Sequence, residues 1–308
     1  GLARDSLDQI RFQRMGMTAT ELKVIPLSPV IGAEISGVDM ASGLDEAAFA
    51  QVKAALVRHQ VIFFRDQEFS LIDLEHFSAR FGPLLRVPYV EPVDGHPDVI
   101  AVLKEADEVQ ISIFGGEWHS DFSYLEAPPS LTVLYAEDVP RGRGDTLWTS
   151  MYAAYEGLSE AFRKKLERMR VMHSGHVYGA KRPRSARMKT SQSMRISRGN
   201  PEADEERPHP AVRVHPETGR RALFFNPIYT TRFEGMEEAE SRPILEALYA
   251  EATRPEYTCR FAWREGSVAV WDNRCTMHLA INDYDGFRRL LYRTTIAGER
   301  PRGPLDSD

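Results

Sequence analysis

The chain has 308 residues, of which 42% are hydrophobic and 27% charged, a composition typical of a globular protein and not of a largely disordered one. Its formal net charge of −6 leaves no basic excess for binding a phosphate backbone, so nucleic acid is excluded as a partner. The two cysteines are too few for a disulfide framework, and the sequence shows neither a long apolar run nor a signal-peptide pattern, so we expect a cytoplasmic protein with no membrane contact.

Short strands and helices alternate in the first third of the chain. Residues 1–22 have no clear hydrophobic period and are predicted to form an N-terminal arm. Beyond them, apolar residues three or four apart indicate helices, and continuous apolar runs bounded by Pro and Gly indicate buried strands. The predicted elements are short strands within 24–38, a helix over 45–57 that Asp45 caps, a strand over 61–67 and a helix over 70–81.

The rest of the chain is richer in strands. We expect one or two helices over 150–172, a hairpin over 211–225 and a helix over 237–253. Residues 177–209 are polar and show little period, so we interpret them as a lid-like insert. The pattern predicts a mainly β (α+β) fold, a barrel or sandwich flanked by helices, in one domain over 23–302 with a tail at 303–308. The remaining predicted strands cover 99–103, 131–136, 257–263, 267–271 and 290–296.

Two separate motifs offer ligands for one metal ion. His119 and Asp121 are two residues apart, and on an extended strand such side chains leave the same face. His278 follows the buried strand at 268–270 and is the best third ligand. Two imidazoles and one carboxylate that leave the opposite face of the ion open are typical of non-haem Fe(II) oxygenases. A zinc hydrolase could use similar ligands, but the sequence has no His-Glu-x-x-His helix.

The order of the motifs is more specific than any single pair. Trp118-His119-x-Asp121 is followed by Gly144-Asp145-Thr146-Leu147-Trp148 and then by Trp271-Asp272-Asn273-Arg274, His278, Arg289 and Arg293. From about Val24 to about Pro301 the chain resembles the TauD/TfdA family of Fe(II)/2-oxoglutarate-dependent dioxygenases. The resemblance implies a double-stranded β-helix (jelly-roll), with Fe(II), O2 and 2-oxoglutarate as cofactors and cosubstrates. It implies hydroxylation of a substrate C–H bond with release of succinate and CO2, because Asp121 keeps the carboxylate that halogenating relatives lack.

The resemblance also assigns roles to three further residues. Arg289 would bind the distal carboxylate of 2-oxoglutarate, and Thr146 would add a hydroxyl to the same carboxylate. A guanidinium suits this role because it binds a carboxylate with two hydrogen bonds and keeps its charge. Arg293 would meet the anionic group of the substrate. On a strand, 289 and 293 share one face, and two buried cations need two anions, which favours an anionic substrate.

The substrate is less well defined by the sequence. Taurine-using members carry a polar His and an Asn where this chain has Val87 and Gly115, so these departures disfavour taurine. Val87, Tyr89, Phe114 and Phe122 are predicted to line a more apolar pocket for a sulfonate, an alkyl sulfate or an aryloxyalkanoate. If the attacked carbon bears sulfur or oxygen, its hydroxylation would break the C–S or C–O bond.

Two alternatives remain open at this point. The chain could be a non-catalytic metal-binding jelly-roll that acts as a binding or sensor protein, or a zinc hydrolase on a similar barrel. Dependence of turnover on Fe(II) and O2 would distinguish the oxygenase from both. Family members are often dimers or tetramers, and we expect a homo-oligomer here.

Overall fold

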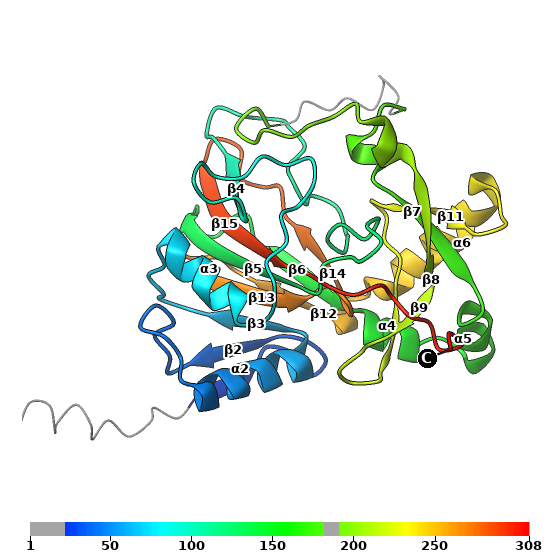
Figure 1. Ribbon diagram of the computed structural model, residues 1–308, viewed down its shortest axis with the longest axis horizontal. Helices are drawn as coiled ribbons and strands as arrows, with labels where there is room; N and C mark the ends of the chain where they lie inside the picture. Colours follow the sequence, from blue (N-terminus) through cyan, green and yellow to red (C-terminus); the bar gives the residue numbers. More distant parts are fainter. Residues whose placement is uncertain (1–21, 182–190, 308) are drawn as a thin grey trace, which may run out of the picture.

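The computed structural model describes residues 22–181 and 191–307. Its largest element is a seven-stranded sheet with the spatial order β1-β2-β3-β13-β5-β15-β4 (Figure 1). Neighbouring strands are antiparallel except β2 and β3, and most pairs join distant parts of the sequence. In spatial order, the strands are β1 (Lys23–Pro26), β2 (Ala33–Ser36), β3 (Val61–Phe64), β13 (Val268–Asp272), β5 (Leu131–Asp138), β15 (Arg289–Ile296) and β4 (Val99–Lys104).

A smaller sheet packs against the inner face of the large one. It has the order β12-β6-β14, formed by β12 (Thr258–Phe261), β6 (Thr146–Ser150) and β14 (Thr276–Ala280). Trp148 of β6 meets Trp271 of β13 edge to face, with ring centroids 5.6 Å apart, and both side chains are buried. Two facing sheets closed over such a core make the double-stranded β-helix, so the predicted fold class is confirmed.

The strand β3 shows why the central strands are continuous apolar runs. Val61 and Phe63 face the core between the two sheets, whereas Ile62 and Phe64 face a second core on the other side of the large sheet. Successive side chains of a strand point to opposite faces, and here both faces are covered. The sequence therefore lacks the polar alternation that marks a half-exposed strand.

Helices α2 (Glu46–His59) and α3 (Leu71–Ala79) cover that second face (Figure 1). The Asp45 carboxylate accepts the backbone N–H of Ala48 and caps α2, and Ser70 forms a capping box with Asp73 at the start of α3. Helix α2 ends at Gln60, which adopts a positive φ of 69°. Both helices begin within a residue of their predicted positions, because caps are local signals.

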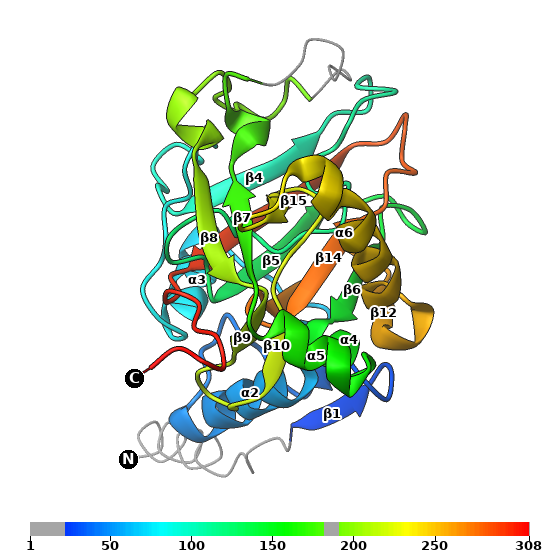
Figure 2. The same ribbon diagram turned by 90° about the vertical axis from the view of Figure 1, so that its right-hand side faces the viewer.

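The remaining elements form the other half of the molecule (Figure 2). The expected hairpin and the expected helix near 237–253 are both present. The elements are α4 (Met151–Glu156), α5 (Glu160–Leu166), β7 (Arg170–Ser174), η1 (His176–Tyr178), η3 (Pro201–Asp204), β8 (Glu206–Pro210), β9 (Val212–Val214), β10 (Arg221–Leu223), β11 (Thr230–Phe233), α6 (Glu238–Ala252) and η4 (Pro255–Tyr257).

Two sequence-based expectations for this half were partly wrong. The helices expected over 150–172 end at Leu166, and β7 begins at Arg170, where it pairs with β8 and β11. The insert expected over 177–209 ends in β8, which runs to Pro210 and contains Pro208 and Pro210, residues that strands disfavour. Because β8 lies at the edge of the β11-β7-β8 sheet, the missing N–H groups are tolerated.

Part of the predicted organisation lies outside the described residues. This holds for residues 182–190 of the expected insert and for residues 1–21 of the expected arm. The division into an arm, one domain over 23–302 and a tail stays a prediction. Within the described residues, no helix combines the length and the apolar character needed to cross a membrane.

Candidate metal centre and its cavity

The structure brings His119, Asp121 and His278 together. The backbones of His119 and His278 exchange two hydrogen bonds, with N···O distances of 3.0 and 2.8 Å, so β14 holds the two imidazoles side by side. One oxygen of Asp121, Oδ1, lies 3.4 Å from Nε2 of His119 and 3.6 Å from Nε2 of His278. All three side chains are buried. These distances place three donor atoms around one point.

The local geometry differs from the extended strand that we expected over 119–121. Only His119 makes a strand-like bridge, and a turn begins at Asp121, after which Phe122 has a positive φ of 46°. The carboxylate still reaches the imidazoles, because Oδ1 lies within contact distance of both. The side chains of His119 and Asp121 do point toward each other, but they do so across a turn and not along an extended strand.

A hydrogen-bond network fixes Asp121 from behind. Its second oxygen, Oδ2, accepts the Thr132 hydroxyl at 2.7 Å, and Asn273 donates to that hydroxyl at 2.9 Å. The Asn273 side-chain oxygen also accepts the backbone N–H of Asp121 at 3.3 Å. Because Oδ2 is occupied in this way, Oδ1 is held on the side of the two imidazoles. Such outer contacts orient metal ligands and strengthen them.

The protonation states suit a divalent metal. Burial alone would raise the pKa of Asp121, but Arg293 and the two imidazoles hold that pKa well below its ordinary value. Burial and the neighbouring His119 hold the pKa of His278 well below its ordinary value, against the attraction of Asp121. The site thus offers a carboxylate and a neutral imidazole. The Nδ1 of His119 lies 2.7 Å from the Glu117 carbonyl, which turns its Nε2 lone pair toward the site.

Arg289 is buried without an aligned carboxylate. Its Nη2 donates to the Gly144 carbonyl at 3.0 Å, and its buried Nε has no hydrogen-bond partner among the described residues. Burial lowers the pKa of Arg289, and Tyr284 with the nearby carboxylates Asp145 and Asp283 offsets this only in part. Gly144 has a φ of +68°, and a Cβ there would lie 2.8 Å from Arg289 Nε, so only glycine leaves this approach open. A carboxylate that enters past Gly144 could accept a hydrogen bond from the unpartnered Nε and neutralise the buried charge of Arg289.

Thr146 is the first residue of β6, two residues after Gly144, whose carbonyl accepts from Arg289, but it does not line the cavity. Its hydroxyl accepts the Trp263 indole N–H at 2.9 Å, so the hydroxyl proton remains free to donate. The Thr146 hydroxyl can therefore act as the hydrogen-bond donor that the family resemblance implies. Its contact with 2-oxoglutarate stays a prediction.

Arg293 lies directly beside the metal ligands. One guanidinium nitrogen is 2.9 Å from Asp121 Oδ2, but the alignment is not that of a hydrogen bond. The guanidinium also lies over the ring of Phe122, 5.2 Å from its centroid, and 6.0 Å from that of Phe114. Its Nε donates to the Thr295 hydroxyl at 3.3 Å, and its Nη2 has no aligned partner among the described residues, so Nη2 is the donor left for a second anion. Arg293 itself is not among the residues that line the cavity, whereas its neighbours Asp121, Phe114 and Phe122 are. Arg288, in contrast, is exposed and pairs with Glu105 and Asp138.

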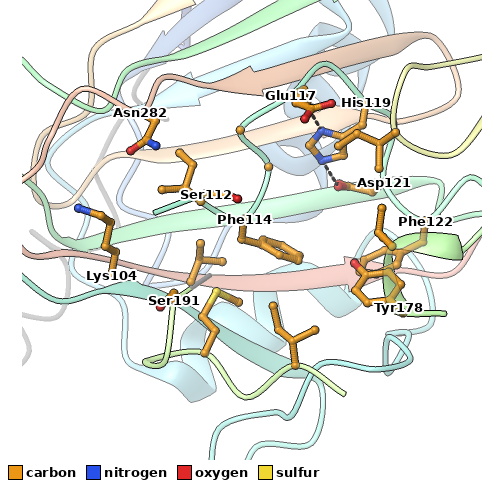
Figure 3. A pocket seen from close by; sticks show the side chains of 18 of the residues that line it. Lys104, Ser112, Phe114, Glu117, His119, Asp121, Phe122, Tyr178, Ser191 and Asn282 are labelled. Atoms are coloured by element: carbon orange, nitrogen blue, oxygen red, sulfur yellow. Dashed lines mark hydrogen bonds and ion pairs between the residues drawn. The ribbon is translucent and has the colours of Figure 1, made fainter. Parts of the chain in front are cut away.

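A cavity of about 590 Å³ opens in front of the triad (Figure 3). Among the predicted pocket residues, Phe114 and Phe122 line it together with His119, Asp121 and Arg289. Val87 and Tyr89 are not among its lining residues. They belong to the hydrophobic cluster behind the wall, where Tyr89 stacks on Tyr178 with centroids 5.3 Å apart. Phe122 and Tyr178, which belong to the same cluster, do line the cavity.

Residues that the sequence analysis did not single out complete the cavity. They are apolar or aromatic in the middle and polar at one end. None belongs to a motif, and they come from four separate stretches (102–112, 178–196, 229 and 282–284), so only pairing in the fold reveals them. The principal ones are Val102, Lys104, Ser112, Tyr178, Ser191, Met194, Ile196, Tyr229, Asn282 and Tyr284.

A second buried group, His215, Asp272 and Cys275, also brings donor atoms close together. There Arg274 donates to both oxygens of Asp272, at 2.9 and 2.8 Å, and His215 Nε2 lies 2.8 Å from Oδ2. The guanidinium already supplies the positive charge that a metal would bring, and burial raises the pKa of the Cys275 thiol. We interpret this group as an ion-pair anchor for the loop that carries Asn273.

A family model described as "Taurine catabolism dioxygenase TauD, TfdA family" matches residues 23–295, which is most of the chain. The chain belongs to the TauD/TfdA family. It is thus an oxidoreductase, a dioxygenase that depends on Fe(II), 2-oxoglutarate and O2. The triad fits this ion, because it is buried, offers two imidazoles and one carboxylate, and keeps its three donor atoms within 4.8 Å of one another.

Individual relatives cover nearly the whole chain. It is 36% identical over 286 residues to the "Alpha-ketoglutarate-dependent sulfate ester dioxygenase" of Pseudomonas putida, with 92% of both chains covered. It is 34% identical to the "Alkylsulfatase" of Acinetobacter baylyi, over 92% of this chain and 87% of the relative. A solved structure described as a taurine dioxygenase from Burkholderia xenovorans is 38% identical, with a TM-score of 0.76 and coverage of 92% and 93%.

Proposed function

We propose that this dioxygenase hydroxylates an alkyl sulfate ester at the carbon that bears the sulfate. The observation that carries the proposal is Arg293, a buried guanidinium beside Asp121 whose donors are not aligned on that carboxylate. A sulfate at Arg293 would hold the adjacent carbon next to the metal triad. The two relatives named for sulfate ester chemistry support this choice of anion.

The chain's own residues position the reactants and exclude water. Arg289 would hold 2-oxoglutarate through its distal carboxylate, and Arg293 would hold the sulfate. The rings of Phe114 and Phe122 would cover the alkyl carbons nearest to the metal. When bound, Fe(II) with 2-oxoglutarate and O2 supplies the oxidising power, while 2-oxoglutarate becomes succinate and CO2.

The products follow from the position of the new hydroxyl group. One oxygen atom enters the C–H bond of the sulfate-bearing carbon and gives a hemiacetal-like sulfate. The hydroxyl proton is lost, its oxygen forms the aldehyde carbonyl, and the C–O bond to sulfate breaks with its electron pair on sulfate. One alkyl sulfate, one 2-oxoglutarate and one O2 thus give aldehyde, sulfate, succinate and CO2.

Taurine is the second candidate, because the similar Burkholderia xenovorans structure is described as a taurine dioxygenase. This chain lacks polar partners for the amine at two places. Gly115 has a φ of +78°, and a Cβ there would approach His119 Cε1 to 3.3 Å, so a side chain is not easily accommodated. Val87 is apolar too, but it does not line the cavity, so its effect on an amine would be indirect. We therefore propose sulfate esters ahead of taurine.

The test is a substrate panel of alkyl sulfates, taurine and an aryloxyalkanoate, assayed with Fe(II), 2-oxoglutarate and O2. The proposal expects succinate and inorganic sulfate in equal amounts from alkyl sulfates, and little substrate-dependent succinate from taurine. Equal or greater turnover of taurine would contradict it. Sulfate release without O2 would instead indicate a hydrolase.

We also propose that the chain assembles into a homo-oligomer. The edge strand β1 leaves apolar side chains exposed, with 39% of Val24 and 56% of Ile25 accessible, and Leu27 continues this patch. A second copy that covers this edge would remove both the apolar surface and the unpaired strand. Light scattering of the purified protein would show a dimer or tetramer, and a monomer would contradict the proposal.

A further inference from the structure

Lys104 places a buried ammonium group in the cavity wall. It is the last residue of β4, only 3% of it is exposed, and it lines the cavity. Its Nζ lies 3.2 Å from Asp285 and 4.8 Å from the centroid of the Tyr284 ring. Asp285 is 46% exposed, and its other oxygen accepts the Gln110 N–H at 3.0 Å. The Asp285 carboxylate that pairs with the Lys104 ammonium is thus also bonded to Gln110 and is about half exposed to solvent.

The position of Lys104 lies far from the metal triad. In the sheet register Lys104 is opposite Arg289, whereas Ile100 is opposite Arg293. Along β4, Lys104 is four residues from Ile100, and this separation corresponds to about 13 Å of strand. Figure 3 shows Lys104, Ser112, Ser191 and Asn282 at one end of the cavity and His119 with Asp121 at the other. The Phe114 side chain lies between the two ends.

The cavity therefore has two polar ends and an apolar middle. Phe114 lies between the ends, and the apolar residues that line the cavity also include Val102, Met194 and Ile196. A cation in such a wall is costly unless an anion or another acceptor completes its hydrogen bonds. Ser112 and Asn282 line the same end. The Asn282 amide donates one hydrogen to the Ile111 carbonyl at 2.8 Å and keeps a second, and the Ser112 hydroxyl can also donate. The set is suited to a carboxylate.

2-Oxoglutarate is the less suitable source of this carboxylate. The cradle of Arg289 and Gly144 already provides donors for its distal carboxylate, including an unpartnered Nε. The Lys104 ammonium has its own counter-ion, Asp285, although Lys104 lies opposite Arg289 in the sheet. Both cations contact the ring of Tyr284, at 4.8 Å for Lys104 and 5.4 Å for Arg289, so a second carboxylate at Lys104 would lie beside that of 2-oxoglutarate.

We propose that Lys104 binds a carboxylate at the end of the substrate remote from the sulfate, so that the preferred substrate is an ω-carboxyalkyl sulfate. This inference rests on the proposed function and names its substrate class. The sulfate lies at Arg293, the alkyl chain crosses the apolar middle, and the carboxylate reaches Lys104. The chain length that fits best spans about 13 Å between the two strand levels.

The experiment compares alkyl sulfates with ω-carboxyalkyl sulfates of equal length, across a series of lengths. The wild-type enzyme should favour the carboxylated member by about 10- to 100-fold in kcat/KM, with an optimum length. Lys104→Met should abolish the preference and leave turnover of the plain alkyl sulfates within about twofold. Lys104→Arg should keep most of the preference. Asp285→Asn, the matched control, keeps the ammonium and should keep the preference.

Three outcomes would overturn the inference. The first is a wild-type enzyme that shows no preference for the carboxylated series while it turns over plain alkyl sulfates, which leaves the proposed function intact. The second is a Lys104→Met enzyme with a raised KM for 2-oxoglutarate and an unchanged preference, which would assign Lys104 to the cosubstrate. The third is absence of turnover with every sulfate ester, which would remove the proposed function as well.

Discussion

The two ends of the cavity are built differently. At the metal end, His119, Asp121 and His278 are fixed by backbone pairing with β14 and by the buried Thr132 and Asn273. At the far end, the wall comes from the loops around Ser112, Ser191 and Asn282, which contribute side chains rather than strand pairs. The metal ligands thus depend on the sheet framework, whereas at the far end the strand residue Lys104 is surrounded by loops that can change independently.

The largest effect should come from breaking the metal end. His278→Ala removes one of three ligands and should lower substrate-dependent succinate formation on the order of 10³-fold or more, with loss of Fe(II) binding. His96→Ala is the control, because His96 pairs with Glu75 away from the site. Circular dichroism should show both variants folded. Retained Fe(II) binding in His278→Ala would contradict the assignment of this ligand.

The next effect should appear at the cosubstrate cradle. Arg289→Gln should raise the KM for 2-oxoglutarate by about 100-fold, because the guanidinium makes charge-assisted contacts that a neutral amide cannot replace. Arg288→Gln is the matched control, since Arg288 pairs with surface carboxylates and should change the KM by less than about twofold. If both substitutions changed the KM for 2-oxoglutarate equally, Arg289 would not be the residue that binds the cosubstrate.

A smaller effect should follow from loosening Asp121. Thr132→Val removes the hydroxyl that Oδ2 accepts, and outer contacts of this kind are worth about 10- to 100-fold in metal affinity. Thr132→Ser keeps the hydroxyl and should bind Fe(II) nearly as well as the wild type. Anaerobic Fe(II) titration of both variants measures the difference. Equal affinities would show that the hydroxyl does not position the carboxylate.

The smallest effect should come from the far end. Glu108 accepts hydrogen bonds from Ser191 and Ser193, and although burial opposes this, these bonds lower its pKa to about 2. Glu108→Gln should raise the KM for the alkyl sulfate by about three- to tenfold and leave kcat unchanged. Asp107→Asn, an exposed neighbour, should change neither. A large fall in kcat would show that this loop is coupled to the chemistry.

The pH dependence of this contact has a defined sign. The folded pKa of Glu108 is depressed, so its stabilising contribution is present above the ordinary pKa of 4.5 and is lost as the pH falls toward about 2. The KM should therefore stay flat between pH 7 and pH 5 if Glu108 alone governs it. A KM that rises within that window in the wild type, but not in Glu108→Gln, would contradict this assignment.

The contrast between the two ends of the cavity also explains which features of the protein could be predicted from its sequence. The jelly-roll, the helix starts at Asp45 and Ser70 and the triad follow from local patterns and from motifs whose order resembles a known family. The role of Lys104 could not be predicted, because it depends on register with Arg289 and on loops that meet only in the fold. Tyr89 was expected at the cavity and lies behind it, since sequence proximity does not specify which ring stands in front.

The central claim is that one ferrous ion and one 2-oxoglutarate bind at the triad and at Arg289. An anaerobic titration of the protein with Fe(II) and 2-oxoglutarate, followed in the visible range, tests it most directly. We expect a charge-transfer band that requires both additions, is perturbed by an alkyl sulfate, and is absent from His278→Ala. Fe(II) binding to the wild-type protein without any such band on addition of 2-oxoglutarate would contradict the account.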